Sequence, residues 1–166
     1  MPTIKSVDIR HEGGMLFHAD PSSGHALSFD DRSSNQGGSP IETILSALGA
    51  CTAMDVVSIA AKKRQAIQRY EIHLRGSQRD EYPQIFTDIE VIHEITGRNL
   101  SEAALRRSIE LSATKYCPVN AMISAGATVV RHGYRIVSTG ASPFEVEGEV
   151  ITTGPYARPD ILVDQP

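Results

Sequence analysis

The sequence contains few cysteines: Cys51 and Cys117 are the two thiols in a chain of 166 residues. They lie far apart in the chain and form no Cys-x-x-Cys motif, which excludes a zinc ribbon and the disulfide framework of small secreted proteins. Two alternatives remain. Either both cysteines are buried structural thiols, as free cysteines commonly are, or they form one reactive pair.

Positive charge is also scarce, because the chain carries a formal net charge of -4. A protein without a basic surface has no electrostatic field to hold the phosphates of nucleic acids. The first residues, MPTIKSVDIRHEGG, lack the charged head and apolar core of a signal peptide, and no lipidation motif stands at either end. We therefore expect a cytoplasmic protein with no nucleic-acid partner and no membrane partner.

The six histidines include no pair at helical ligand spacing, three or four residues apart. Most of them fall in segments that alternate like strands, so we expect imidazoles on the surface or on a sheet face. The sequence thus predicts no metal site and no cofactor. These residues are His11, His18, His25, His73, His93 and His132.

One apolar stretch, Ser39 to Lys63, predicts a long helix. Ser39 suits the N-cap, Pro40 the first helical position, and Glu42 completes a capping box. The pattern predicts a helix buried on most sides, because apolar residues surround most of its circumference. Its charge-free part is too short and too rich in small residues to span a bilayer. The apolar positions are Ile44, Leu45, Ala47, Leu48, Cys51, Met54, Val57 and Ala60.

The rest of the chain alternates between strand-like and helical patterns. A second helix is expected over Ser101–Cys117, and Pro118 restarts the helix as far as Ala125. The order of elements favours an α+β fold in which an antiparallel sheet packs on the buried central helix. Residues 1–137 form one domain, and 138–166 form a C-terminal extension rather than a second domain. The expected strands are Thr3–Arg10, Met15–Ala19, His25–Phe29, Ile67–Arg75, Ile85–Thr96, Thr128–Val137 and the strand-like piece Phe144–Ile151.

The two cysteines have different local surroundings. Pro118 at the first position of a short helix places Cys117 at its N-cap, where unpaired backbone N–H groups lower the pKa of a thiol. Cys51 lies inside an apolar helix, which raises its thiol pKa, and Asp55 one turn further on opposes ionisation. Cys51 therefore needs a positive charge from elsewhere in the fold to become reactive.

The segment SPIETILSALGACTAMDVVS, followed later by SATKYCPV, resembles the OsmC/Ohr superfamily of osmotically inducible and organic hydroperoxide resistance proteins. The resemblance extends over roughly Thr3 to Val137, and the details look most like the branch whose members have no assigned substrate. Its most specific parts are the Pro-x-Glu entry into the central helix, the small residues before Cys51, and the Cys-Pro-Val that begins at Cys117.

The resemblance implies an OsmC-like fold in an intertwined homodimer with active sites at the subunit interface. It also implies a thiol peroxidase. Cys51 would attack a small organic hydroperoxide and become a sulfenic acid, Cys117 would resolve it as a disulfide, and an external dithiol would restore both thiols. Glu42 matches the glutamate that helps to hold a catalytic arginine in this family.

The arginine itself has one candidate in the segment before the helix, Arg32 in DDRSSNQGG, which directly follows Asp30 and Asp31 and stands at an offset that departs from the peroxidase pattern. If Arg32 does not reach Cys51, the thiol lacks an activator. An alternative function follows from this departure: a redox sensor without catalysis, or a protein that binds a small apolar ligand with the same fold.

Overall fold

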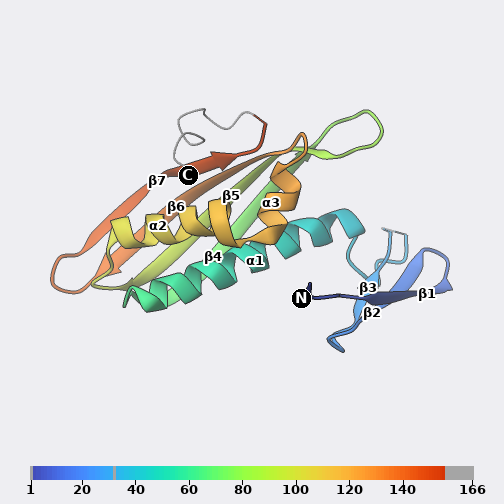
Figure 1. Ribbon diagram of the computed structural model, residues 1–166, viewed down its shortest axis with the longest axis horizontal. Helices are drawn as coiled ribbons and strands as arrows, with labels where there is room; N and C mark the ends of the chain where they lie inside the picture. The colour runs from blue at the N-terminus through green and yellow to red at the C-terminus, as the bar shows by residue number, and fades with distance from the viewer. Residues whose placement is uncertain (1, 32, 156–166) are drawn as a thin grey trace. The chain divides into compact units, whose positions relative to one another are not determined.

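The computed structural model describes residues 2–31 and 33–155, which divide into two compact units, 1–46 and 47–166. The division falls inside the long helix α1 (Pro40–Lys62). Figure 1 shows the elements of both units.

The first unit contains a sheet of three antiparallel strands in the order β1-β2-β3. The strands are β1 (Val7–Gly13), β2 (Leu16–Pro21) and β3 (Leu27–Phe29). Gly13 and Gly14 both have positive φ angles, 115° and 58°, which allow the tight turn between β1 and β2. The three strands expected at the start of the chain are therefore confirmed, with bounds shifted by a few residues.

Helix α1 begins as the sequence predicts. The backbone N–H and the hydroxyl of Ser39 donate to Glu42 Oε2 at 3.0 and 2.6 Å, and the N–H of Glu42 donates to Ser39 Oγ at 3.3 Å. This reciprocal pattern is a capping box, which satisfies N–H groups that the helix itself leaves unpaired.

The second unit contains a four-stranded sheet in the order β4-β5-β6-β7. The expectation of an antiparallel sheet is wrong for one pair, because β5 and β6 run parallel while the other neighbouring pairs are antiparallel. The reason is the helical connection between these two strands, since parallel neighbours need a long crossover of this kind. The strands are β4 (Ala66–Gln78), β5 (Phe86–Arg98), β6 (Val129–Thr139) and β7 (Phe144–Thr153).

The crossover consists of α2 (Glu102–Leu111), one π-helical turn η1 (Ser112–Tyr116) and α3 (Pro118–Ser124). Ser101 caps α2, because its Oγ accepts the N–H of Ala104 at 3.3 Å. Figure 1 shows α2 and α3 lying across the sheet formed by β4 to β7. The expected helix break at Pro118 is confirmed.

Strand β7 falls within the predicted C-terminal extension, residues 138–166. It pairs with β6 over nearly its whole length and forms one edge of the sheet. The part of the extension as far as Thr153 is thus built into the second unit, and residues 156–166 lie outside the described residues.

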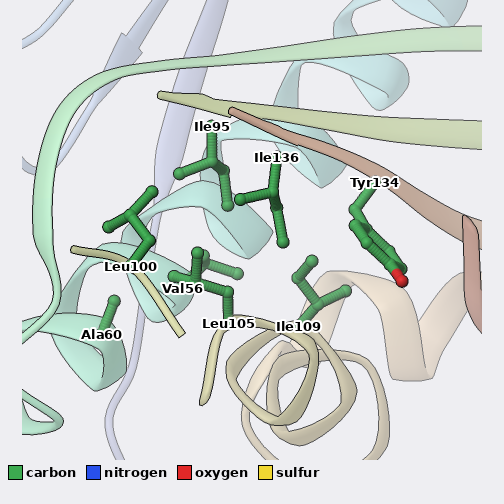
Figure 2. Close-up of a cluster of buried hydrophobic side chains, with 8 residues drawn as sticks. All are labelled: Val56, Ala60, Ile95, Leu100, Leu105, Ile109, Tyr134 and Ile136. Atoms are coloured by element: carbon green, nitrogen blue, oxygen red, sulfur yellow. The ribbon is translucent and has the colours of Figure 1, made fainter. Parts of the chain in front are cut away.

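The hydrophobic core of the second unit lies between helices and sheet (Figure 2). Its side chains come from α1, the end of β5, α2 and β6, so the helices pack on one face of the sheet. The residues are Val56, Ala60, Ile95, Leu100, Leu105, Ile109, Tyr134 and Ile136.

Helix α1 is buried on one face rather than on most sides, which corrects the expectation from its composition. Its buried residues recur at helical spacing: Leu48, Gly49, Thr52, Val56 and Ala60. On the other side Met54 and Val57 are 73% and 47% exposed in the single chain. An apolar helix with one uncovered face has surface left for a further packing partner.

By length and composition alone, α1 would pass as a membrane-crossing helix. The same test is passed by core helices of soluble proteins. Val56 and Ala60 pack in the hydrophobic core, and Asp55 accepts a hydrogen bond from the hydroxyl of Ser112 at 2.9 Å. These contacts are those of a core helix.

Candidate functional site

The fold brings Cys51 and Cys117 together with a carboxylate. Cys51 and Asp55 lie one turn apart on α1 and thus on the same helix face, while Cys117 comes from the junction between η1 and α3. The two sulfur atoms and one carboxylate oxygen of Asp55 all lie within 4.8 Å of one another. Both cysteines are free thiols.

Cys117 is the N-cap of α3, as the sequence predicts. Its sulfur accepts the backbone N–H of Asn120 at 3.3 Å and the hydroxyl of Thr52 at 3.7 Å. The side chain is buried, at 3% exposure. These two donors come from α1 and α3 and hold the sulfur of Cys117 in a fixed position.

Cys51 is half-buried, and the pKa of its thiol is raised to about 11. Burial is the largest cause, the hydrogen bond to Cys117 and the negative charges of Cys117 and Asp55 act in the same direction, and the backbone N–H of Val119 acts against them. The Cys51 thiol is therefore protonated at neutral pH in the isolated chain. A thiolate at this position needs a cation nearby.

Asp55 is held in place by the π-helical turn. Ser112, the first residue of η1, is buried and donates its hydroxyl to Asp55 Oδ2 at 2.9 Å. Single π-helical turns occur frequently at functional sites, where they change the direction of side chains. Here the turn brings Ser112 under the carboxylate and ends next to Cys117.

The sequence of this chain is similar to that of known proteins. The sequence profile of the family "OsmC-like protein" matches residues 33–132. Protein YhfA of Escherichia coli K12 is 39% identical over 125 residues, which cover 75% of this chain and 92% of YhfA. The chain belongs to the OsmC-like family. The resemblance seen in the sequence is thereby confirmed.

Solved structures agree with the α+β fold of the OsmC-like family. A hypothetical protein from Aquifex aeolicus VF5 is 27% identical with a TM-score of 0.75, and the match covers 84% of this chain and 100% of that one. An organic hydroperoxide resistance protein OsmC from Legionella pneumophila, also described as a predicted redox protein, is 18% identical with a TM-score of 0.57. That match covers 84% and 98% of the two chains and shows the shared fold.

A chain of buried hydrogen bonds leads from the Cys117 helix into the sheet of this OsmC-like protein. His132 Nε2 lies 3.1 Å from Asn120 Oδ1, His132 Nδ1 lies 3.3 Å from His93 Nε2, and His93 Nδ1 lies 2.7 Å from the hydroxyl of Tyr70. Both imidazoles are fully buried. The end of this chain, Asn120, is the residue whose backbone N–H faces the sulfur of Cys117.

The tautomers of both histidines follow from Asn120. Its Nδ2 donates to the carbonyl of Ala113 at 2.9 Å, so its Oδ1 must be the acceptor toward His132. A neutral His132 that donates from Nε2 accepts at Nδ1, and His93 must then donate from Nε2 and accept the hydroxyl of Tyr70 at Nδ1. Every donor in this chain meets an acceptor, provided that both histidines are neutral.

Burial keeps both imidazoles neutral. Burial, together with the neighbouring His132, lowers the pKa of His93 to about 3, and burial lowers the pKa of His132 to about 4. Both lie in strands, as the prediction of surface or sheet-face imidazoles allows, but on the buried face of the sheet and not at the surface. Strand alternation contained the signal, because His93 shares its parity with the buried residues Ile89, Val91 and Ile95 of β5.

The remaining predicted site residues belong to the first unit. Glu42 lies in the first turn of α1 and accepts from Ser39, so the capping role is present. Arg32 lies outside the described residues. The roles of Cys51, Cys117, Glu42 and Arg32 in a reaction stay predictions.

Proposed function

We propose that this protein is a thiol-dependent peroxidase that reduces small organic hydroperoxides, with Cys51 as the attacking residue and Cys117 as the resolving residue. The observation that carries the proposal is the placement of both sulfur atoms within 4.8 Å, on two different elements. Cys51 is the more exposed of the two thiols, which suits the residue that meets a substrate, whereas Cys117 is buried behind it.

The reaction proceeds in three steps. The thiolate of Cys51 attacks the terminal oxygen of the hydroperoxide, the O–O bond breaks, and the departing alkoxide takes a proton to become an alcohol. Cys51 is then a sulfenic acid. The thiolate of Cys117 attacks its sulfur and expels the hydroxyl, which leaves as water after protonation, and a disulfide forms. A dithiol reductant then exchanges with this disulfide, returning two thiols and becoming oxidised itself.

The surroundings of Cys117 support its part. The N–H of Asn120 and the hydroxyl of Thr52 hold its sulfur within 4.8 Å of the sulfur of Cys51, and attack on a sulfenic acid requires such closeness. Among the relatives, the Legionella pneumophila protein is named for organic hydroperoxide resistance, which supports the class of substrate.

Cys51 requires a cation, because burial, Cys117 and Asp55 all raise its pKa. In this proposal Arg32 supplies the positive charge and Glu42 holds the guanidinium. The proposal also includes a homodimer, supported by the uncovered apolar face of α1 around Met54 and Val57. Light scattering at several protein concentrations measures the dimer directly.

The test follows thiols and peroxide together. Reduced protein is mixed with cumene hydroperoxide or with hydrogen peroxide, and intact-mass measurement follows the loss of two hydrogens as the disulfide forms. We expect faster loss with the organic peroxide, turnover when a dithiol is added, a stable sulfenic acid in Cys117→Ser, and no reaction in Cys51→Ser. Full turnover in Cys51→Ser, or no peroxide consumption by the wild type, would refute the proposal.

One observation favours the second candidate, a redox sensor or a binder of a small apolar ligand. The Cys51 thiol with its pKa near 11 is a poor nucleophile unless a cation reaches it. A slow disulfide without turnover, or thiols that stay unmodified while an apolar ligand co-purifies, would support this function instead.

A further inference from the structure

Three metal-ligand atoms converge at the thiol pair. They are Cys51 Sγ, Cys117 Sγ and a carboxylate oxygen of Asp55, and all three lie within 4.8 Å of one another. Cys51 and Asp55 are supplied by one rigid helix at a spacing that puts both on one face, and Cys117 by the N-cap of another helix. Thiolate sulfur and carboxylate oxygen are both ligands of zinc in proteins.

The distances suit a zinc ion after a small contraction. A Zn–S bond measures about 2.3 Å, so two sulfurs on one tetrahedral ion lie about 3.8 Å apart. Because the two sulfur atoms lie within 4.8 Å of each other, they need to approach by about 1 Å or less to share one ion. Rotation about the Cα–Cβ bonds of Cys51 and Asp55 provides such movements without moving the helices.

Two of the three ligands, Asp55 and Cys117, are oriented by hydrogen bonds from residues outside the cluster. The hydroxyl of Ser112 donates to Asp55 Oδ2, and the N–H of Asn120 and the hydroxyl of Thr52 donate to the sulfur of Cys117. Partners of this kind fix ligand geometry in metal sites and stabilise the deprotonated ligands. They come from buried residues, so the arrangement is built into the packing of the fold.

Charge also favours a cation at this position. When the two thiols ionise beside Asp55, the cluster carries three negative charges in a partly buried place. A divalent ion reduces the net charge to one and removes the mutual repulsion of the three groups.

We propose that the reduced protein binds one zinc ion through Cys51, Asp55 and Cys117, with a fourth position open to water or a small ligand. On binding, each thiol loses a proton, so that Zn²⁺ and two S–H groups give two Zn–S bonds and two released protons. The site excludes the disulfide, because a sulfur pair joined by an S–S bond has no thiolate to offer. Histidine spacing and the absence of a Cys-x-x-Cys motif predict no metal site, whereas these ligands are one carboxylate and two thiols far apart in the chain.

The proposal does not depend on peroxidase activity, and its test uses no peroxide. Reduced full-length protein is titrated anaerobically with Co²⁺, which takes tetrahedral zinc sites and reports thiolate ligation through charge-transfer absorption in the near ultraviolet. We expect the absorption to saturate at one equivalent per chain and to disappear when Zn²⁺ is added in slight excess. Protein oxidised beforehand with diamide should show none of this absorption.

Variants separate this cluster from other metal-binding groups. Cys51→Ser and Cys117→Ser should each reduce the charge-transfer intensity per bound ion to about half, and Ser112→Ala should weaken Co²⁺ binding about 10- to 100-fold. His73→Ala is the matched control, because Glu71, His73 and Glu94 form the other candidate cluster among the described residues. This variant should leave the absorption unchanged.

A second measurement uses only the wild-type protein, so it tests the proposal even if a variant does not fold. One equivalent of Zn²⁺ should slow the alkylation of both thiols of the wild-type protein by iodoacetamide at least tenfold, as followed by intact mass. Absence of charge-transfer absorption in the wild type, its retention at full intensity in Cys51→Ser, its loss in His73→Ala, or unprotected thiols would each overturn the proposal.

Discussion

Lowering the pH from 7.5 to 5 should destabilise this protein by about 4 kcal/mol through two buried histidines. Burial lowers the pKa of His93 to about 3 and that of His132 to about 4, while both are close to 6.5 in the unfolded chain. Between these values the unfolded state binds protons that the folded state does not. Stability is therefore complete above pH 6.5 and decreases as the pH falls below it.

The magnitude follows from the linkage relation. At pH 5 an unfolded imidazole with a pKa of 6.5 gains about 2 kcal/mol from protonation, and the folded one gains almost nothing. The two histidines together give about 4 kcal/mol, a large part of the stability of a typical domain. This number is set by the unfolded pKa, so it changes little as long as both folded pKa values stay below pH 5.

Urea unfolding at constant protein concentration, followed by circular dichroism at pH 7.5, 6.5, 6 and 5, measures this dependence. His93→Gln and His132→Gln should each remove about half of it, although both lower the stability at pH 7.5 because they disturb the buried hydrogen bonds. His25→Gln, at an exposed position, is the control and should keep the full dependence. A change below about 1 kcal/mol in the wild type, or an unchanged slope in either buried variant, would show that these imidazoles are not held neutral.

Four further changes have defined outcomes. Tyr70→Phe leaves His93 Nδ1 without its donor and should cost about 1–3 kcal/mol in urea unfolding, and a neutral result would remove the proposed direction of the hydrogen-bond chain. Leu48→Ala, at a fully buried position, should cost about 2–5 kcal/mol and lower the dimer content in light scattering; an unaffected stability would contradict the packing of α1. Ser101→Ala removes the cap of α2 and should cost about 0.5–2 kcal/mol in the same assay, and no loss would argue against that cap. If the peroxidase and zinc proposals both hold, one equivalent of Zn²⁺ should suppress thiol oxidation by cumene hydroperoxide, and Asp55→Asn should relieve the suppression; undiminished oxidation of the zinc-loaded wild type would contradict the shared use of the thiols.

Local signals in the sequence predicted most of the elements. The capping box at Ser39, the start of a helix at Ser101 and the helix restart at Pro118 depend on a few neighbouring residues, and each forms as expected. The direction of β6 depends instead on the crossover as a whole. A long helical connection between two strands is typical of parallel neighbours. The connection between β5 and β6 therefore indicates their parallel direction, whereas the strand patterns alone do not.

The histidines and Asp55 show a different limit. His93 and His132 are polar by type, and residue type suggested exposure, whereas strand parity placed them in the interior. Their burial is tolerated because Tyr70 and Asn120 form hydrogen bonds with the imidazole nitrogens. These two partners come from another strand and from the crossover. Asp55 was recognised as a group that opposes ionisation of Cys51. Its closeness to both sulfurs depends on where α3 begins relative to α1, which no local pattern encodes.

The same shortage of positive charge underlies both proposals for the thiol site. Burial, the neighbouring thiol of Cys117 and the carboxylate of Asp55 together raise the pKa of the Cys51 thiol to about 11, so this sulfur ionises near neutral pH only when a cation is supplied. A guanidinium would leave the electron pairs of the Cys51 sulfur free to attack a peroxide, whereas a zinc ion would bind them. Which cation occupies the site therefore decides between reaction and metal binding. Asp55 favours the metal, because it adds a ligand and opposes a free thiolate in the same place.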